Sequence, residues 1–497
     1  MDDVRGWSSF RNAIRGLLLI LPALAGCPER QTIETAQDSL PFAGVQIRIG
    51  VPSALDLRTA WEGPLNEWEA QTGAKYHLEE IPQPGADEAF AIFSGSIAPT
   101  LALFPLERAG ELIAAGSLAP LPESVRGDAD GVNWTDLFQG LRDKIASRKG
   151  QPIVLPLASP VLVCCYRQDL LQAAGLKPPQ TWDDYQQLVD KIESWAPGLN
   201  AVEPWGESFR ATTFLARAVS AAQHPGQYSL FFDIETGEPL IDNAAFVQAL
   251  EASRRALQKM PGDVLNFGPD DCRNELLMGR AALAIVCEPS PWDVARHREA
   301  VDQPADKRIA AASFGVIRLP GSREVYDASR RLWEPLPDKG VSHVTLTAFS
   351  GWAIGAGSSS SRVQIEAAWN ALLKVAGPDL VSGFPPALIG LCRESQLQSG
   401  SYASSRDGDG AVSVANSVAQ SLRDSRLVAE LPIAHRHEFR LALTRSLGMA
   451  IAGSQSPEEA LRDAAAEWRE IISRIGPSRH RDNYRASLGL SPKPKAE

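Results

Sequence analysis

Residues 150–192 read GQPIVLPLASPVLVCCYRQDLLQAAGLKPPQTWDDYQQLVDKI. Apolar and β-branched residues run from residue 152 to residue 166, but Pro156 and Pro160 interrupt the run. A central strand does not tolerate prolines within one ladder, so we predict two extended pieces joined by a bend at Ala158-Ser159-Pro160. Such a bend would carry the chain from one sheet into another, as a hinge between two lobes does.

Two helices are predicted after this bend. The first is short and ends at Gly175, and a turn at Pro178-Pro179 follows it. The second begins at Thr181, where Asp184 three residues later completes the pattern of a capping box. The stretch therefore predicts the order strand, bend, strand, helix, turn and helix.

This order resembles a passage of the extracellular solute-binding proteins, family 1, of ABC importers. The residues that carry the resemblance are Leu155-Pro156, Tyr166, Asp169-Leu170, Ala174-Gly175-Leu176, Pro178-Pro179 and Thr181-Trp182-Asp183. The resemblance implies an α/β fold of the two-lobed periplasmic-binding-protein type II, with a hinge of several chain crossings and a ligand cleft between the lobes.

Strands and helices also alternate outside this stretch. Val45–Val51 and Leu101–Phe104 are predicted strands, and the segment between them contains a helix that ends at Gly73. Alternation of this kind favours a largely parallel sheet covered on both faces. Residues 344–355 would form a second crossing, which returns the chain to the first lobe.

Domain boundaries follow from these features. The predicted parts are a lipoprotein signal peptide at 1–27, a tether at 28–44, lobe 1 at 45–158 and 344–378, lobe 2 at 159–343 and 379–475, an inserted charged loop at 322–342 within lobe 2, and a loose tail at 476–497.

The N-terminus predicts export. Three arginines precede the apolar run 16–26, which is too short to span a bilayer as a mature helix and typical of a secretory signal. The run ends in Leu24-Ala25-Gly26-Cys27, which resembles the bacterial lipobox and implies lipidation of Cys27. The alternatives are an ordinary signal peptide and an apolar N-terminal helix with a chance cysteine. With a lipid on Cys27, the protein would be anchored at the cell surface or in the periplasm.

Charge and cysteine usage restrict the partners. The formal net charge of -11 argues against nucleic acid or an anionic membrane surface as the main partner. Cys164 and Cys165 would point to opposite faces of a strand, so we expect no bond between them. Buried free thiols are the favoured interpretation, and Cys272 with Cys287 is the one pair to test as a disulfide. We predict no metal site and no cofactor.

Motifs for catalysis are absent from the sequence. It contains no His-Glu-x-x-His, Gly-x-Ser-x-Gly, Walker-type or Gly-x-Gly-x-x-Gly pattern, although a pair of glycosidase carboxylates needs no motif. Trp68, Trp369 and Trp468 lie on apolar stripes and are assigned to the core, whereas His435 and His437 are expected on a solvated face.

Other aromatic and polar residues lie where strands end, which is where open α/β sheets bind ligands. Rings stack on the C–H faces of sugars, and carboxylates accept hydrogen bonds from their hydroxyls. The resemblance implies that Trp352, at the second crossing, stacks on sugar. The full set of predicted ligand-binding residues is Ser53, Phe104, Ser159, Trp205, Glu207, Glu288, Trp292, Phe349, Ser350 and Trp352.

The sequence therefore predicts a monomeric solute-binding protein that is not an enzyme. It would capture a small-molecule solute, most simply a carbohydrate, by hinge closure and deliver it to the membrane permease subunits of an ABC transporter. A ligand-binding component of a sensor system and an extracytoplasmic carbohydrate-active enzyme are the alternatives.

Overall fold

The computed structural model of the chain describes residues 40–53, 56–81, 92–94, 98–127, 131–288, 313–377, 383–385, 388–398 and 409–493. The described residues from 41 to 493 belong to one compact unit. Cys27, the predicted signal peptide and most of the tether lie outside the described residues. Among the described helices, none combines the length and apolar character that crossing a membrane requires.

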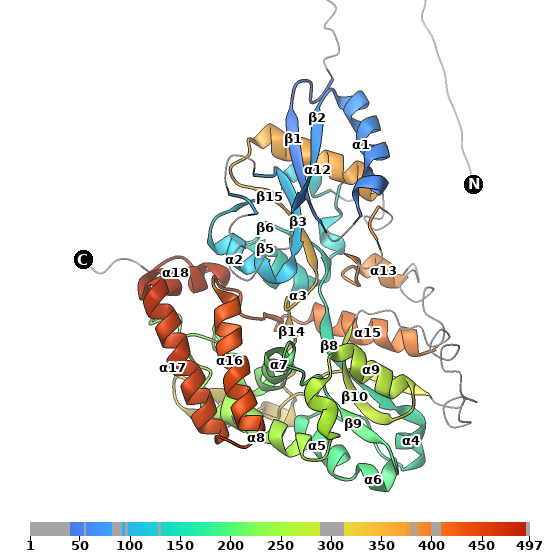
Figure 1. The fold of residues 1–497 in the computed structure, drawn as a ribbon, viewed down its shortest axis with the longest axis vertical. Coiled ribbons are helices and arrows are strands. Elements are labelled where there is room, and N and C mark those ends of the chain that lie inside the picture. The colour runs from blue at the N-terminus through green and yellow to red at the C-terminus, as the bar shows by residue number, and fades with distance from the viewer. Residues whose placement is uncertain are drawn as a thin grey trace, which may run out of the picture. The chain divides into compact units, whose positions relative to one another are not determined.

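The first sheet is built from strands of the N-terminal third plus one strand from much later in the chain (Figure 1). Its order is β2 (Lys75–Ile81), β1 (Gln46–Pro52), β3 (Leu101–Pro105), β15 (Trp352–Gly357) and β4 (Leu118–Ala119), and β7 (Leu155–Ala158) also pairs with β15. Strands β1, β2 and β3 are parallel, whereas β15 is antiparallel to β3 and β7. Helices α1 (Arg58–Thr72) and α12 (Arg362–Ala376) pack together at this sheet.

The second sheet has the order β11 (Phe314–Arg318), β8 (Val161–Arg167), β10 (Ala281–Glu288) and β9 (Asn200–Val202). Every residue of β8 is buried, which explains its unbroken apolar run. The helices of this part are α4 (Gln168–Ala173), α5 (Trp182–Asp190), α6 (Ile192–Trp195), α7 (Arg210–Ala222), α8 (Ala244–Leu257), α9 (Pro269–Leu277) and α15 (Asp409–Arg423). The predicted capping box of Thr181 is present, since Asp184 N–H donates to the Thr181 hydroxyl.

The predicted bend is confirmed. Strand β7 belongs to the first sheet and β8 to the second, and Ser159 lies between them. The second crossing is also present. It runs from β14 (Leu346–Thr347), which pairs in parallel with β16 (Val428–Ala429), to β15 in the first sheet. The Ser159 and Thr347 hydroxyls hydrogen-bond at 2.7 Å and tie the two crossings together.

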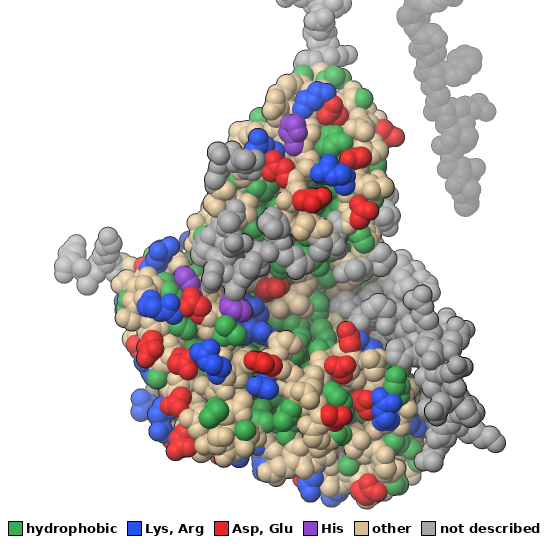
Figure 2. Space-filling view, viewed as in Figure 1, with side chains coloured by type: hydrophobic (Ala, Val, Ile, Leu, Met, Phe, Trp, Pro, Cys, Tyr) green, Lys and Arg blue, Asp and Glu red, His purple; other side chains and the backbone are tan. Residues whose placement is uncertain are grey.

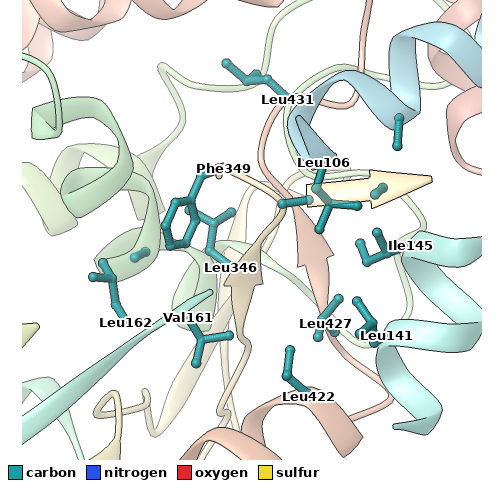
Figure 3. Close-up of a cluster of buried hydrophobic side chains, with 14 of the residues drawn as sticks. Leu106, Leu141, Ile145, Val161, Leu162, Leu346, Phe349, Leu422, Leu427 and Leu431 are labelled. Atoms are coloured by element: carbon teal, nitrogen blue, oxygen red, sulfur yellow. The ribbon is translucent and has the colours of Figure 1, made fainter. Parts of the chain in front are cut away.

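Hydrophobic side chains fill the junction around these crossings (Figure 3). Phe349 and Leu346 lie beside Val161 and Leu162, and Leu106 lies on the other side of the strands. The junction is therefore apolar, and the burial of its side chains holds the two crossing segments in place.

The C-terminal third consists of helices α16 (Arg436–Ile451), α17 (Pro457–Ile475) and α18 (Pro477–Ser487). The predicted start of α17 is confirmed, because Ser456 and Glu459 form a capping box. Trp468 is fully buried, and its indole N–H donates to the Phe439 carbonyl at 2.8 Å. The prediction of a loose tail after residue 476 is wrong for α18, since Tyr484 is buried against Phe232 and α18 contacts α2 (Ala109–Ala114).

Two further expectations need correction. The inserted segment 322–342 is not a plain loop, because β12 (Glu324–Asp327) and β13 (Leu332–Pro335) form a hairpin followed by the short η7 turn (Pro337–Lys339). Cys272 and Cys287 are free, so the disulfide is not formed. Cys164, Cys165, Cys272 and Cys392 are buried thiols, as favoured.

Short elements complete the described part of the chain. They are η2 (Leu106–Arg108), η3 (Glu123–Val125), η4 (Trp134–Asp136), α3 (Gln139–Leu141), η5 (Arg142–Ala146), β5 (Ser147–Arg148), β6 (Gln151–Pro152), η6 (Gly262–Asn266) and α13 (Glu394–Gln398).

Candidate functional site

The carboxyl edge of the first sheet brings together residues that are far apart in the sequence. Ser53 follows the end of β1, and Glu107 follows the end of β3. Trp352 begins β15, which runs antiparallel to β3, so it pairs with Pro105 at the same edge. The backbone N–H of Leu106 donates to the Gly351 carbonyl at 3.0 Å and holds these two segments side by side.

Three of the predicted residues at this edge retain surface that a ligand can reach. Trp352 and Ser350 are half-buried, and Ser53 is exposed. Trp352 also packs on the core with part of its ring. An edge where parallel strands end is the usual ligand position in open α/β sheets.

Two of the predicted aromatic residues are buried in this structure. Phe104 is fully buried in the core, where its ring meets Phe93 edge-on with centroids 6.1 Å apart. Phe349 is buried in the junction, and its ring lies edge-on to Phe209 at 5.6 Å. The sequence identified the strand ends correctly but not the side of the strand that each ring occupies.

Two predicted residues of the second part are also enclosed by protein. Trp205 is fully buried, and its indole N–H donates to the Glu203 carboxylate at 3.0 Å. Glu288 is fully buried and forms an ion pair with Arg273. These partners are supplied by the fold itself, so neither side chain is offered to a ligand.

The other three predicted ligand-binding residues differ in their exposure. Ser159 is fully buried, and its hydroxyl bonds to Thr347 rather than facing a ligand. Glu207 is exposed after β9, as a ligand contact requires. Trp292 lies outside the described residues.

A buried carboxylate that the sequence did not reveal lies opposite this edge. Glu430 follows β16 and is 1% exposed. One of its carboxylate oxygens accepts from Thr212 at 2.6 Å, and the other accepts from Arg436 at 2.7 Å and Arg440 at 3.1 Å. Arg436 Nε also donates to the Glu430 carbonyl at 3.3 Å, and Arg440 Nη2 donates to the Ser208 carbonyl at 2.5 Å and to the Thr212 hydroxyl at 3.2 Å.

Glu107 and Glu430 line one small cavity of about 10 Å³. The Oε2 atom of Glu107 is shielded from solvent and has no hydrogen-bond partner among the described residues. Burial raises the pKa of Glu107, and the nearby Arg436 opposes that rise. The cavity is large enough for about one water molecule.

Glu111 provides a second contact between α2 and the start of α16. It pairs with Arg108 at 3.1 Å, burial raises its pKa, and the backbone of His435 partly offsets that rise. His435 and His437 are themselves exposed, as expected. Figure 2 shows basic and histidine side chains over the upper end of α16, where the surface is hollowed.

Chemically, the edge offers carboxylates, guanidiniums, hydroxyls and one indole face. We call Ser53, Glu107, Trp352 and Arg440 the edge site; Glu430 is buried, and both its oxygens accept from protein donors. Glu430 escaped the sequence analysis because no periodic or cap signal marks the segment 424–435. Its position one residue after a two-residue strand is a property of the fold only.

The two sheets joined by chain crossings are the architecture of the two-lobed binding proteins. A family model described as bacterial extracellular solute-binding protein matches residues 66–369. The chain therefore belongs to the bacterial extracellular solute-binding proteins, which supply ABC transporters and are exported.

Solved structures with low sequence identity show the same fold. The sugar-binding protein MalE from Xanthomonas citri is 18% identical with a TM-score of 0.59, and the match covers 86% of this chain and 98% of that one. A solute-binding protein from Agrobacterium radiobacter in complex with ribitol is 18% identical with a TM-score of 0.56, covering 87% and 100%. Maltose-bound MalE3 from T. maritima is 17% identical with a TM-score of 0.54, covering 86% and 100%.

Proposed function

We propose that this protein captures a carbohydrate or polyol at the edge site and delivers it to the permease of an ABC importer. The observation that carries the ligand class is the combination of a half-buried Trp352 with an unpartnered, buried Glu107 oxygen. A flat ring suits the C–H face of a sugar, and an unpaired carboxylate oxygen suits a hydroxyl donor. The bound ligands of similar structures, ribitol and maltose, belong to the same chemical class.

Closure follows from the way the sheets are joined. Both crossings, at Ser159 and at Phe349, pass through the apolar junction, so the two parts can turn about it without losing either core. A solute that contacts groups from both parts, such as Glu107 and Arg440, favours the closed state, because only differential contacts shift a conformational equilibrium. The protein acts in this proposal as a binder without turnover.

The test is a thermal-shift screen against sugars and polyols, followed by calorimetric titration of any solute that stabilises the protein. We expect one solute class to bind saturably. Trp352→Ala should weaken its binding at least tenfold, because the stacking surface is lost. Trp333→Ala is the matched control, since Trp333 is also half-buried but belongs to β13 of the insertion hairpin. Equal affinity of Trp352→Ala and the unmodified protein would refute the assignment of the ring.

A second variant tests the carboxylate. Glu107→Gln keeps the shape and removes the charge, so binding of a polyhydroxy solute should weaken while the unliganded protein folds normally. Release of a cleaved or modified product from an oligosaccharide would contradict the binding-only role.

Anchoring is the last part of the proposal. Cys27 is the lipidated residue, and Cys27→Ser should move the protein from the membrane fraction to the soluble exported fraction. Unchanged membrane association of this variant would overturn the lipid anchor without affecting the solute-binding role.

A further inference from the structure

A second and much larger cavity adjoins the small cavity that Glu107 and Glu430 line. Its volume is about 520 Å³, which is in the range of pockets that hold small molecules. Four separate segments line it, namely residues 143–149, 223–231, 425–432 and 484–489. Glu107 is not among its lining residues, but Arg148, Ala429 and Pro432 line both cavities.

The last of these segments belongs to α18, which the sequence alone had predicted to be a loose tail. Tyr484 and Ser487 face the cavity from this helix. The Tyr484 hydroxyl accepts the backbone N–H groups of Leu230 at 3.3 Å and Phe231 at 3.4 Å, so the helix is fixed to the opposite wall. The cavity therefore exists because the C-terminal helix folds back onto the body.

Its walls carry an excess of positive charge. Among the described lining residues, Lys144, Arg148, Lys149 and Arg426 are basic, and Asp143 is the one carboxylate. Asp143 also pairs with Arg142, which lies outside the lining. His224 Nε2 donates to the Glu334 carboxylate at 3.0 Å.

Among the described residues, the guanidiniums of Arg148 and Arg426 donate hydrogen bonds to uncharged groups only. Arg148 Nη1 donates to the carbonyls of Lys144 at 3.3 Å and Ser147 at 2.8 Å. Its Nε atom is shielded from solvent and has no partner among the described residues. Arg426 donates to the Ser342 hydroxyl at 3.1 Å and the His343 carbonyl at 2.6 Å.

The Arg148 guanidinium is buried and forms no ion pair with a carboxylate of the described residues. Its pKa is lowered to about 10, and desolvation is the cause. A buried cation that the fold leaves unpaired costs free energy, which an anion supplied from outside would recover.

We propose that this cavity is a second ligand site, which binds a small anion bearing carboxylate or phosphate groups. The anion would sit between Arg148 and Arg426, where charge-assisted hydrogen bonds are strongest, with Lys144 and Lys149 at the rim. Tyr484 and Gln227 add neutral polar groups to the same walls.

Calorimetric titration at low ionic strength tests the proposal, with inorganic phosphate and citrate as the two probes and chloride as the ionic-strength control. We expect saturable 1:1 binding of at least one probe. Arg426→Gln and the double variant Lys144→Gln/Lys149→Gln should each weaken it about tenfold or more. Lys177→Gln, an exposed lysine outside the cavity, is the matched control and should leave the affinity unchanged.

The two probes separate the chemistry of the ligand. Binding of phosphate alone assigns a phosphoryl ligand, and binding of citrate alone assigns a polycarboxylate. Absence of saturable binding of both would overturn the proposal, as would an equal loss of affinity in the Lys177→Gln control. Because Lys144 and Lys149 are exposed, their variants test the site even where a substitution of Arg148 prevents folding.

Discussion

Replacing His480 should change how the stability of the protein depends on pH. His480 lies on α18 and is 3% exposed, with its ring centroid 4.5 Å from that of Phe232 and 5.6 Å from that of Phe439. Its Nε2 atom has no hydrogen-bond partner among the described residues. Burial lowers its pKa from 6.5 to about 4, and the nearby His435 adds to that effect.

The direction of the pKa shift decides whether His480 adds stability at high or at low pH. The folded-state pKa lies below the unfolded one, so the unfolded chain takes up the proton first as the pH falls. The contribution of His480 is therefore complete above about pH 6.5 and is lost as the pH falls toward 4. Between about pH 7.5 and about pH 5 the loss amounts to roughly 2 kcal/mol. His343, whose pKa is also lowered to about 4 by burial, contributes in the same direction.

Urea denaturation of His480→Asn at the two pH values measures this effect. The variant should lose less stability on acidification than the unmodified protein, by about 2 kcal/mol, although it is less stable at neutral pH because packing is lost. His437→Asn is the matched control, since His437 is exposed. If His480→Asn lost as much unfolding free energy on acidification as the unmodified protein, His480 would not be the source of the pH dependence.

Two local substitutions test the fold further. Gly351→Ala should destabilise the second crossing by about 1–3 kcal/mol, because Gly351 has a φ of 102° and an added Cβ would lie 2.2 Å from the Ala158 carbonyl oxygen; urea denaturation measures it, and an unchanged midpoint would contradict the close approach. Ser456→Ala should cost about 1 kcal/mol by removing the N-cap of α17, and thermal unfolding should show a lower midpoint; the Ser360→Ala control, one residue before the cap of α12, should not.

The parts of the fold that sequence predicts well are those with local signals. Pro156 and Pro160 mark the bend between β7 and β8, and Ser456 with Glu459 marks the start of α17. Both depend on residues within a few positions of one another, so no knowledge of the tertiary structure was needed.

The candidate site was predicted less completely, because burial depends on contacts between distant segments. Trp352 and Phe349 lie three residues apart at the same crossing, yet one is half-buried and the other is in the apolar junction. Glu430 gains its role from Thr212, 218 positions away, which no local pattern encodes. The helix α18 was missed for the same reason, since its polar sequence is held by a few buried residues such as Tyr484.

The edge site is expected to bind a sugar or polyol and to release it unchanged. Calorimetric titration with the solute selected by the thermal-shift screen tests it most directly, with the solute recovered and analysed afterwards. We expect saturable binding of one solute per chain, with an affinity at least tenfold weaker in Trp352→Ala. We also expect quantitative recovery of the intact solute. Binding that is unaffected by both Trp352→Ala and Glu107→Gln, or recovery of a cleaved product, would contradict it.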